Sequence, residues 1–252
     1  IGNFNLMSYR HLPDDFSEKY DSVYIELPSE LLDSVQMNID YNASLDELEF
    51  AESVGFDMLG VNEHHSNGYA MMPSPNLMAA ALSRRTRNAS LLVLGASLAL
   101  YNPPQRVAEE FAMLDCMSGG RLIAGFPVGT PMDSCYAYSK NPSELRDRYY
   151  EAADLVMQAW TRPEPFSFHG RFNQERYVNI TPRPVQTPHP PVWVPGGNSV
   201  ETWRFCAEND YVYCYTTHFG YLSGEQIIRG FWDEMKAQGR EPNPYQTGII
   251  QY

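Results

Sequence analysis

The segments FDMLGVNEHH (residues 56–65), PNLMAAALSRRTR (75–87) and ASLLVLGASLAL (89–100) decide the fold of this chain. The first and third are short apolar runs typical of buried strands, and the second is a helical pattern that begins with proline. A strand, a loop, a helix and another apolar strand are typical of parallel strands joined by helical crossovers. This stretch therefore predicts an α/β protein.

The same cycle recurs along the rest of the sequence. We expect further strands at residues 4–9, 121–126, 192–194, 211–217 and 247–252, and helices at 44–55, 105–117, 143–160, 200–209 and 223–238. Six complete units and a seventh strand favour a closed barrel over an open doubly wound sheet. We expect a (β/α)8 TIM-type barrel that lacks its last strands and helices in this chain, with a reduced-barrel variant as the alternative. Residues 1–252 are predicted to form a single domain, with a hairpin and a proline-rich excursion at about 164–191.

Composition excludes several classes of partner. A net charge of −13 argues against binding nucleic acid or an anionic membrane surface. The four cysteines show no CxxC spacing, so reduced thiols are favoured over disulfides or a zinc site. No apolar run reaches the roughly 18 residues of a membrane helix, and the first residues lack a signal-peptide pattern. We therefore expect a cytoplasmic protein with no nucleic-acid or membrane partner.

In a barrel of this type the working residues follow the carboxyl ends of the strands. The candidates are Asn62-Glu63-His64-His65, Ser97 to Asn102, Gly125 to Gly129, Pro195 to Ser199 and Thr216-Thr217-His218.

The Glu63-His64-His65 cluster allows three hypotheses. A metal site is disfavoured, because successive strand side chains point to opposite faces. The histidines could instead cap the strand by bonding loop carbonyls. We favour a catalytic cluster in which His64 moves a proton while Glu63 and His65 support it, and we expect no metal.

The turn Gly196-Gly197-Asn198-Ser199 joins a predicted strand to a predicted helix. It is either an ordinary serine cap or a phosphate site, because glycines and free N–H groups at a helix N-terminus suit an anion. No GxGxxG, Walker or GxSxG motif occurs, so a nucleotide-fold oxidoreductase, a kinase and a serine hydrolase are not indicated.

Several motifs resemble those of the bacterial-luciferase-like flavin monooxygenases, in the same order. They are Asn62 to His65 followed by Pro73-Ser74-Pro75-Asn76, Asn102 to Glu110, Leu114-Asp115-x-x-Ser118-Gly119-Gly120-Arg121, Phe166-x-Phe168-His169-Gly170, and Pro182-Arg183-Pro184-Val185-Gln186 with Pro190 to Val194. The resemblance runs from about residue 4 to the end.

This resemblance implies a flavin enzyme, its partners and a set of site residues. Reduced FMN, often delivered by a separate reductase, would react with O2 to oxidise a small organic substrate, and relatives commonly pair as dimers. His64 matches the catalytic histidine, and the strand end around Ser97-Leu98 matches a frequent non-proline cis peptide. The residues expected to bind the flavin are Asn62, Ser97, Leu98, Gly125, Pro127, Gly196, Gly197, Asn198, Ser199 and Val200.

Two alternatives and one departure accompany the resemblance. A deazaflavin-dependent hydride-transfer enzyme of the same superfamily and a non-catalytic flavin-binding protein stay open. Luciferase catalytic chains carry a cysteine and an arginine where this chain has Pro127 and Val128. The prediction is an FMN-dependent monooxygenase for which this departure gives no basis to assume light emission.

Overall fold

The computed structural model describes residues 1–129, 131–217 and 220–251. Its main sheet has seven strands in the order β1-β2-β3-β4-β7-β8-β9, and every neighbouring pair is parallel. These strands are β1 (Gly2–Phe4), β2 (Met58–Val61), β3 (Ser90–Leu94), β4 (Leu122–Gly125), β7 (Val192–Gly196), β8 (Val212–Thr216) and β9 (Thr247–Ile250). The sheet curls into a nearly closed barrel, and residues of its two edge strands, β1 and β9, line one cavity between them.

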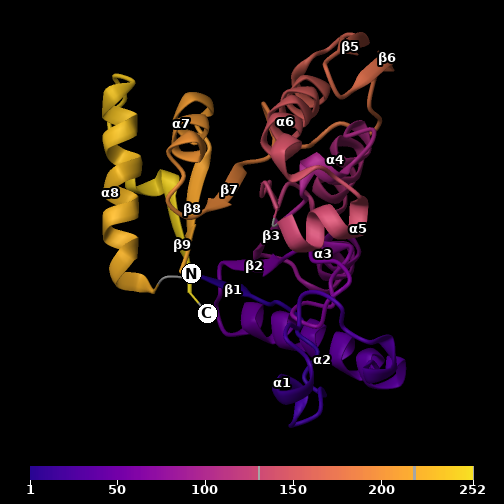
Figure 1. The fold of residues 1–252 in the computed structure, drawn as a ribbon. Helices are drawn as coiled ribbons and strands as arrows, with labels where there is room; N and C mark the ends of the chain where they lie inside the picture. The colour runs from indigo at the N-terminus through magenta and orange to yellow at the C-terminus, as the bar shows by residue number, and fades with distance from the viewer. Residues whose placement is uncertain (130, 218–219, 252) are drawn as a thin grey trace.

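Helices cover the outside of the barrel (Figure 1). The longer ones are α2 (Ser34–Ser53), α3 (Pro75–Arg85), α4 (Gln105–Ser118), α6 (Leu145–Thr161), α7 (Val200–Asn209) and α8 (Tyr221–Ala237). The shorter elements are α1 (Phe16–Lys19), α5 (Tyr136–Tyr138), a π-helix at Pro131–Cys135 and 3-10 turns at Ser29–Leu31, Leu98–Leu100, Pro142–Glu144 and Pro244–Gln246. None of the described helices combines the length and apolar character needed to cross a membrane.

Two apolar clusters hold these layers together. The larger one packs the outward-facing strand residues against α2, α3, α4, α6, α7 and α8, with Phe111, Tyr149 and Phe231 fully buried. The smaller one contains Leu92, Leu94 and other side chains from alternate strand positions, which fill the inside of the barrel. The prediction of an α/β barrel is confirmed.

Three predicted element boundaries are wrong. The first strand ends at Phe4 instead of Tyr9, and the left-handed backbone at Met7 (φ 51°) turns the chain away from the sheet. The predicted helix cap at Ser44 lies inside α2, which starts ten residues earlier, where the Asp33 carboxylate accepts from the backbone N–H groups of Val35 and Gln36.

The third strand is also shorter than predicted, ending at Leu94 instead of Leu100. A Cβ at Gly95 would lie 1.9 Å from the carbonyl oxygen of Gly125, so the chain there packs too closely on β4 for a side chain. The non-proline cis peptide is Leu94-Gly95, three residues before the position expected at Ser97-Leu98.

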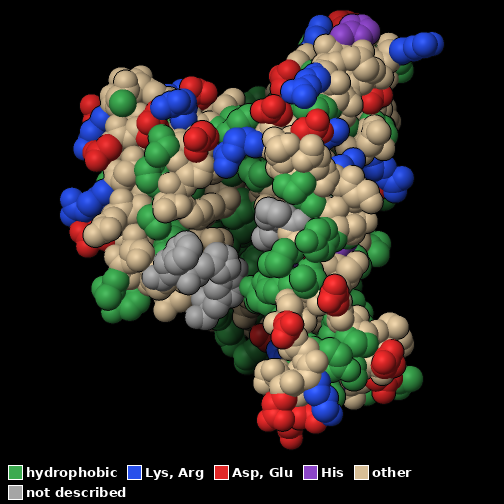
Figure 2. All heavy atoms as spheres, viewed as in Figure 1, with side chains coloured by type: hydrophobic (Ala, Val, Ile, Leu, Met, Phe, Trp, Pro, Cys, Tyr) green, Lys and Arg blue, Asp and Glu red, His purple; other side chains and the backbone are tan. Residues whose placement is uncertain are grey.

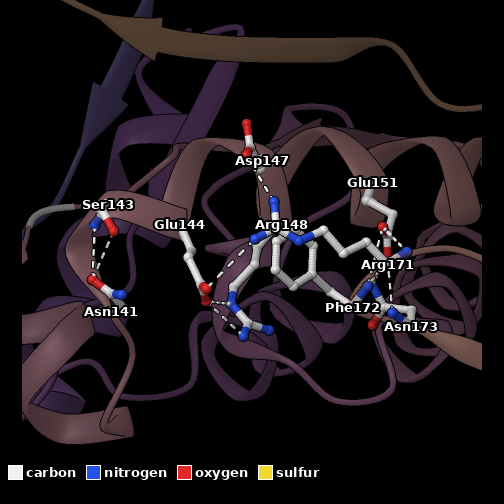
Figure 3. Close-up of polar contacts among 9 residues, drawn as sticks. All are labelled: Asn141, Ser143, Glu144, Asp147, Arg148, Glu151, Arg171, Phe172 and Asn173. Carbon is white, nitrogen blue, oxygen red and sulfur yellow. Dashed lines mark hydrogen bonds and ion pairs between the residues drawn. The ribbon is translucent and has the colours of Figure 1, made fainter.

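The excursion begins with an antiparallel hairpin, β5 (Phe166–His169) and β6 (Gln174–Val178). One carboxylate of α6, that of Glu151, accepts hydrogen bonds from three successive backbone N–H groups of the hairpin turn, at residues 171–173 (Figure 3). The buried Asp115 of α4 likewise accepts from two backbone N–H groups of the proline-rich stretch, at residues 185 and 186. Both carboxylates therefore fix the excursion against the helices that surround the barrel.

Candidate functional site

A cavity of about 300 Å³ lies at the carboxyl ends of β2, β3, β4, β7 and β8. Figure 2 shows the molecule hollowed between the side of α7 and α8 and the side of α6, with hydrophobic atoms in the depth of the hollow. The predicted site residues that line the cavity are Asn62, Glu63, His64, His65, Ser97, Pro127, Gly196, Gly197 and Ser199. The strand ends thus bring together residues that are up to 137 positions apart in the sequence, from Asn62 to Ser199.

Four predicted flavin-binding residues do not line this cavity. Leu98 is fully buried in the core, and a Cβ at Gly125 would meet the carbonyl oxygen of Val93 at 2.3 Å. Asn198 lines a different cavity on the outer surface, and the side chain of Val200 is largely exposed. His218, also singled out from the sequence, lies outside the described residues.

Glu63 connects the ends of β2 and β3. Its carboxylate, whose side chain is 1% exposed, accepts from the backbone N–H of Ser97 at 2.8 Å, the phenol of Tyr101 at 2.9 Å and Nε2 of His65 at 2.7 Å. Burial, and then the charge of Glu63, raise the pKa of Tyr101 well above its ordinary value, so this phenol stays a donor. Glu63 thereby holds His65, and the His65 ring packs edge-on against Tyr138 with 4.8 Å between ring centroids.

His64 is held by a different carboxylate. Its Nδ1 lies 2.6 Å from Oδ2 of Asp133, in the π-helix after β4, and the Asp133 side chain is 4% exposed. Because a carboxylate only accepts, the neutral imidazole carries its proton on Nδ1 and its lone pair on Nε2. Tyr69 and Tyr24 pack edge-on against the same ring. A histidine oriented by a buried carboxylate is suited to accept a proton at Nε2.

Asp133 was missed by the sequence analysis. It lies 69 residues from His64, in a segment with no regular apolar pattern, so only the folded chain brings the two together. The described part of the chain contains no group of three His, Cys, Asp or Glu side chains placed to hold a metal ion.

The opposite wall of the cavity is positively polarised. It contains the N-terminus of α7, where the Ser199 hydroxyl caps the backbone N–H of Thr202, and the guanidinium of Arg146 from the start of α6. Arg146 donates only long hydrogen bonds, to the phenol of Tyr150 at 3.3 Å and to Thr202 Oγ1 at 3.4 Å, and forms no ion pair with a described carboxylate. A helix N-terminus beside a guanidinium that forms no ion pair with a described carboxylate suits an anion.

The pKa of the exposed Glu201 carboxyl group is lowered at this helix N-terminus, which shows that the site stabilises negative charge. The backbone N–H of Glu201 itself, and then the Ser199 hydroxyl and the charge of Arg146, lower the pKa of Glu201. Arg146 was also missed by the sequence analysis, because an arginine in an amphipathic helix has the pattern of an ordinary surface charge.

The floor of the cavity holds an unsatisfied amide. Asn62 is 4% exposed, and neither its Oδ1 nor its Nδ2 has a hydrogen-bond partner among the described residues. Buried polar groups are almost always paired, so this amide is suited to a ligand that offers both a donor and an acceptor. A Cβ at Gly197 would meet no atom within 4 Å, which leaves open space beside the anion site. The cavity thus combines an anion site, at Arg146 and the N-terminus of α7, with an unpaired amide at Asn62, which are the kinds of contact that a flavin mononucleotide requires.

Comparison with known proteins identifies one family, whose members use either a flavin or the deazaflavin F420. The model of the luciferase-like monooxygenase family matches residues 25–250. The uncharacterized protein y4wF of Sinorhizobium fredii is 34% identical over 193 residues, which cover 73% of this chain and 55% of that protein. An F420-dependent glucose-6-phosphate dehydrogenase of Kineococcus radiotolerans is 26% identical over 198 residues, covering 75% of this chain and 57% of the dehydrogenase. The chain therefore spans little more than half the length of these curated relatives.

Solved structures share the fold at low sequence identity. The monooxygenase RslO1 of Streptomyces bottropensis superposes with a TM-score of 0.78 and 23% identity, covering 98% of this chain and 69% of that chain. The oxygenating constituent of 3,6-diketocamphane monooxygenase of Pseudomonas putida, a type II Baeyer–Villiger monooxygenase in complex with FMN, superposes with a TM-score of 0.76 and 20% identity, covering 86% and 62%. At this identity the two structures support the fold alone.

Proposed function

The chain belongs to the luciferase-like monooxygenase family, and on this premise we propose that it is an FMN-dependent oxidoreductase that uses reduced FMN and O2 to oxidise a small organic molecule. The observation that carries the proposal is the cavity itself, which has a proton-accepting dyad, His64–Asp133, on one side and an anion site at Arg146 on the other.

The proposed division of labour follows from the contacts. Arg146 and the N-terminus of α7 bind the flavin phosphate, and the Asn62 amide bonds the polar edge of the flavin ring. His64 takes up or returns a proton at Nε2, while Asp133 keeps its ring in one orientation. Bound FMN would supply the redox chemistry and the reaction with O2. Glu63 and His65 are proposed as positioning residues, since they bond to each other and to Ser97 and Tyr101, and the His65 ring packs against Tyr138.

Partners and location belong to the same proposal. One curated relative is named as the oxygenase component of a flavin-dependent monooxygenase, so a separate reductase is proposed to supply reduced FMN. Exposed apolar side chains on α2 and at its C-cap, including Ile39, Phe50 and Val54, support a homodimer formed through this helix. A cytoplasmic location is proposed because reduced thiols and a supply of reduced flavin are found there.

The deazaflavin alternative is supported by the F420-dependent relative, and its cofactor would use the same anion site. An anaerobic titration with reduced FMN and, in parallel, reduced deazaflavin, followed through quenching of protein fluorescence, separates the two. Tighter binding of reduced FMN and O2 uptake after air is admitted support the proposal. Preference for the deazaflavin without O2 uptake overturns it in favour of hydride transfer. Tight flavin binding without any turnover supports the non-catalytic alternative, which the His64–Asp133 dyad disfavours.

A further inference from the structure

A second cavity, of about 320 Å³, lies on the other side of His64. His64 lines both cavities, whereas Asn62, Glu63 and His65 line only the first. The walls of the second cavity come from the segment before α2, from α2 itself and from the loop that follows β2. Its apolar members are Leu27, Leu32, Met37, Ala70, Met71 and Pro73, and we refer to it as the Met37 cavity.

Two polar side chains of the Met37 cavity, those of Tyr41 and Asn67, are bonded within the protein. The Tyr41 phenol donates to the carbonyl oxygen of Met71. The Asn67 amide accepts from the backbone N–H of Ala70 at 3.1 Å and donates to the carbonyl oxygen of His65 at 2.9 Å. These contacts hold the loop in place, and the polar groups that complete the lining are the uncharged hydroxyls of Ser29 and Ser66 and the ring of His64.

The two cavities differ in the charge of their lining residues. The described lining of the Met37 cavity contains no aspartate, glutamate, lysine or arginine, whereas the first cavity contains Glu63, Asp133 and Arg146. An ionised ligand that entered the Met37 cavity would lose its hydration without gaining a counter-charge. A volume near 300 Å³ is at the lower end of the range for small-molecule pockets.

From this contrast we infer that the Met37 cavity binds the organic substrate, and that the substrate is a small, uncharged and largely apolar molecule. The inference rests on the proposed function, in which the first cavity binds the flavin. His64 lines both cavities, so its ring lies at the boundary where the flavin site and the substrate site meet, and Tyr24 and Tyr69 pack edge-on against it. No charge on the substrate would be needed for recognition, because shape and apolar contact select it.

The test uses a matched pair of probes, 2-octanone and octanoate, which differ mainly in charge. Binding to the full chain is measured by ligand-observed saturation-transfer NMR without flavin. We expect the ketone to bind about tenfold or more tightly than the carboxylate, because the cavity offers no counter-charge. Equal binding of the two probes, or no binding of the ketone, overturns the inference.

Three variants localise the binding. Met37→Trp fills the cavity and is expected to abolish ketone binding, whereas Val35→Trp, on an exposed position of the same helix, leaves it unchanged. Met37→Lys places a cation at the half-buried position and is expected to reverse the preference toward octanoate. Ketone binding that all three variants leave unchanged places the probe elsewhere and overturns the inference.

The outcome is separable from that of the proposed function. Reduced FMN is titrated into wild type and Met37→Trp, and equal affinities are expected because Met37 does not line the first cavity. If the ketone binds but reduced FMN does not, the proposed function fails and the Met37 cavity stands as an apolar site. If reduced FMN binds and the ketone does not, only the inference about the substrate fails.

Discussion

Replacing Glu63 tests whether the end of β2 depends on one buried carboxylate. Three donors converge on it: the backbone N–H of Ser97, the phenol of Tyr101 and Nε2 of His65, all within 2.7–2.9 Å. In Glu63→Ala all three donors lose their acceptor in a site that is almost completely buried from solvent. In Glu63→Gln the amide oxygen still accepts from Ser97, while the amide N–H groups face the Tyr101 and His65 side chains, which can both rearrange to accept.

The expected losses follow from these contacts. Leaving a buried donor without its acceptor costs about 1–3 kcal/mol, so Glu63→Ala, which leaves three donors that can partly rearrange, is expected to lose about 3–5 kcal/mol of the free energy of unfolding. Glu63→Gln keeps the volume and most of the bonds but loses their charge assistance, which predicts a loss of about 1–2 kcal/mol. For a chain of this size, about 2–4 °C per kcal/mol gives a fall in Tm of about 6–20 °C for the alanine variant.

The assay is equilibrium unfolding in urea, with Glu225→Ala as the control. Glu225 forms an exposed ion pair with Arg229, so its removal is expected to cost only about 0.3–0.5 kcal/mol. Hydrogen exchange of the Ser97 amide gives a local readout, with faster exchange expected in the order wild type, glutamine, alanine. An alanine variant no less stable than the Glu225 control would refute the assignment of Glu63 as a positioning residue.

Three further predictions address the dyad, the hairpin and the thiols. Asp133→Asn is expected to lower substrate-dependent O2 uptake by about 10- to 100-fold without weakening reduced-FMN binding, because His64 loses its anionic partner. Unchanged O2 uptake would contradict a role for the His64–Asp133 dyad. Gly170→Ala places a Cβ 2.3–2.6 Å from the Glu151 carboxyl group, so a loss of about 1–3 kcal/mol is expected in thermal unfolding, and an unchanged Tm would contradict the anchoring of the hairpin. Cys116 is exposed, whereas burial raises the pKa of each of the other three thiols. A disulfide reagent at pH 8 should therefore modify one thiol in the native protein and four after denaturation. Rapid modification of all four thiols in the native protein would contradict the packing.

The fold was largely predictable because its signals are local. Strands such as β4 and β8 are short apolar runs beside glycine turns and helical patterns, and their order along the chain fixes a parallel topology. The errors occur where tertiary contacts override the local pattern. The apolar run Leu98–Leu100 forms a buried 3-10 turn instead of a strand, since burial alone does not distinguish the two.

The candidate site was only half predictable. The cluster Glu63-His64-His65 could be found because strand ends carry function in barrels of this type. Its internal pairing could not, because Glu63 was expected to support His64 but contacts His65, and the carboxylate beside His64 belongs to Asp133. Contacts between residues far apart in the sequence leave no local signal. The place of Arg146 in the cavity could not be predicted for the same reason.

The central claim is that the cavity at the strand ends binds a flavin through its phosphate. It is tested most directly by titrating reduced FMN and reduced riboflavin, which lacks the phosphate, into wild type, Arg146→Ala and the control Arg148→Ala. Arg148 lies on the same helix but is paired with Glu144 and stacked on Phe172 (Figure 3). Losing a charge-assisted contact predicts that Arg146→Ala weakens FMN by about 10- to 100-fold and riboflavin by less than about twofold. Equal weakening of both ligands, or the same effect from Arg148→Ala, would contradict the account.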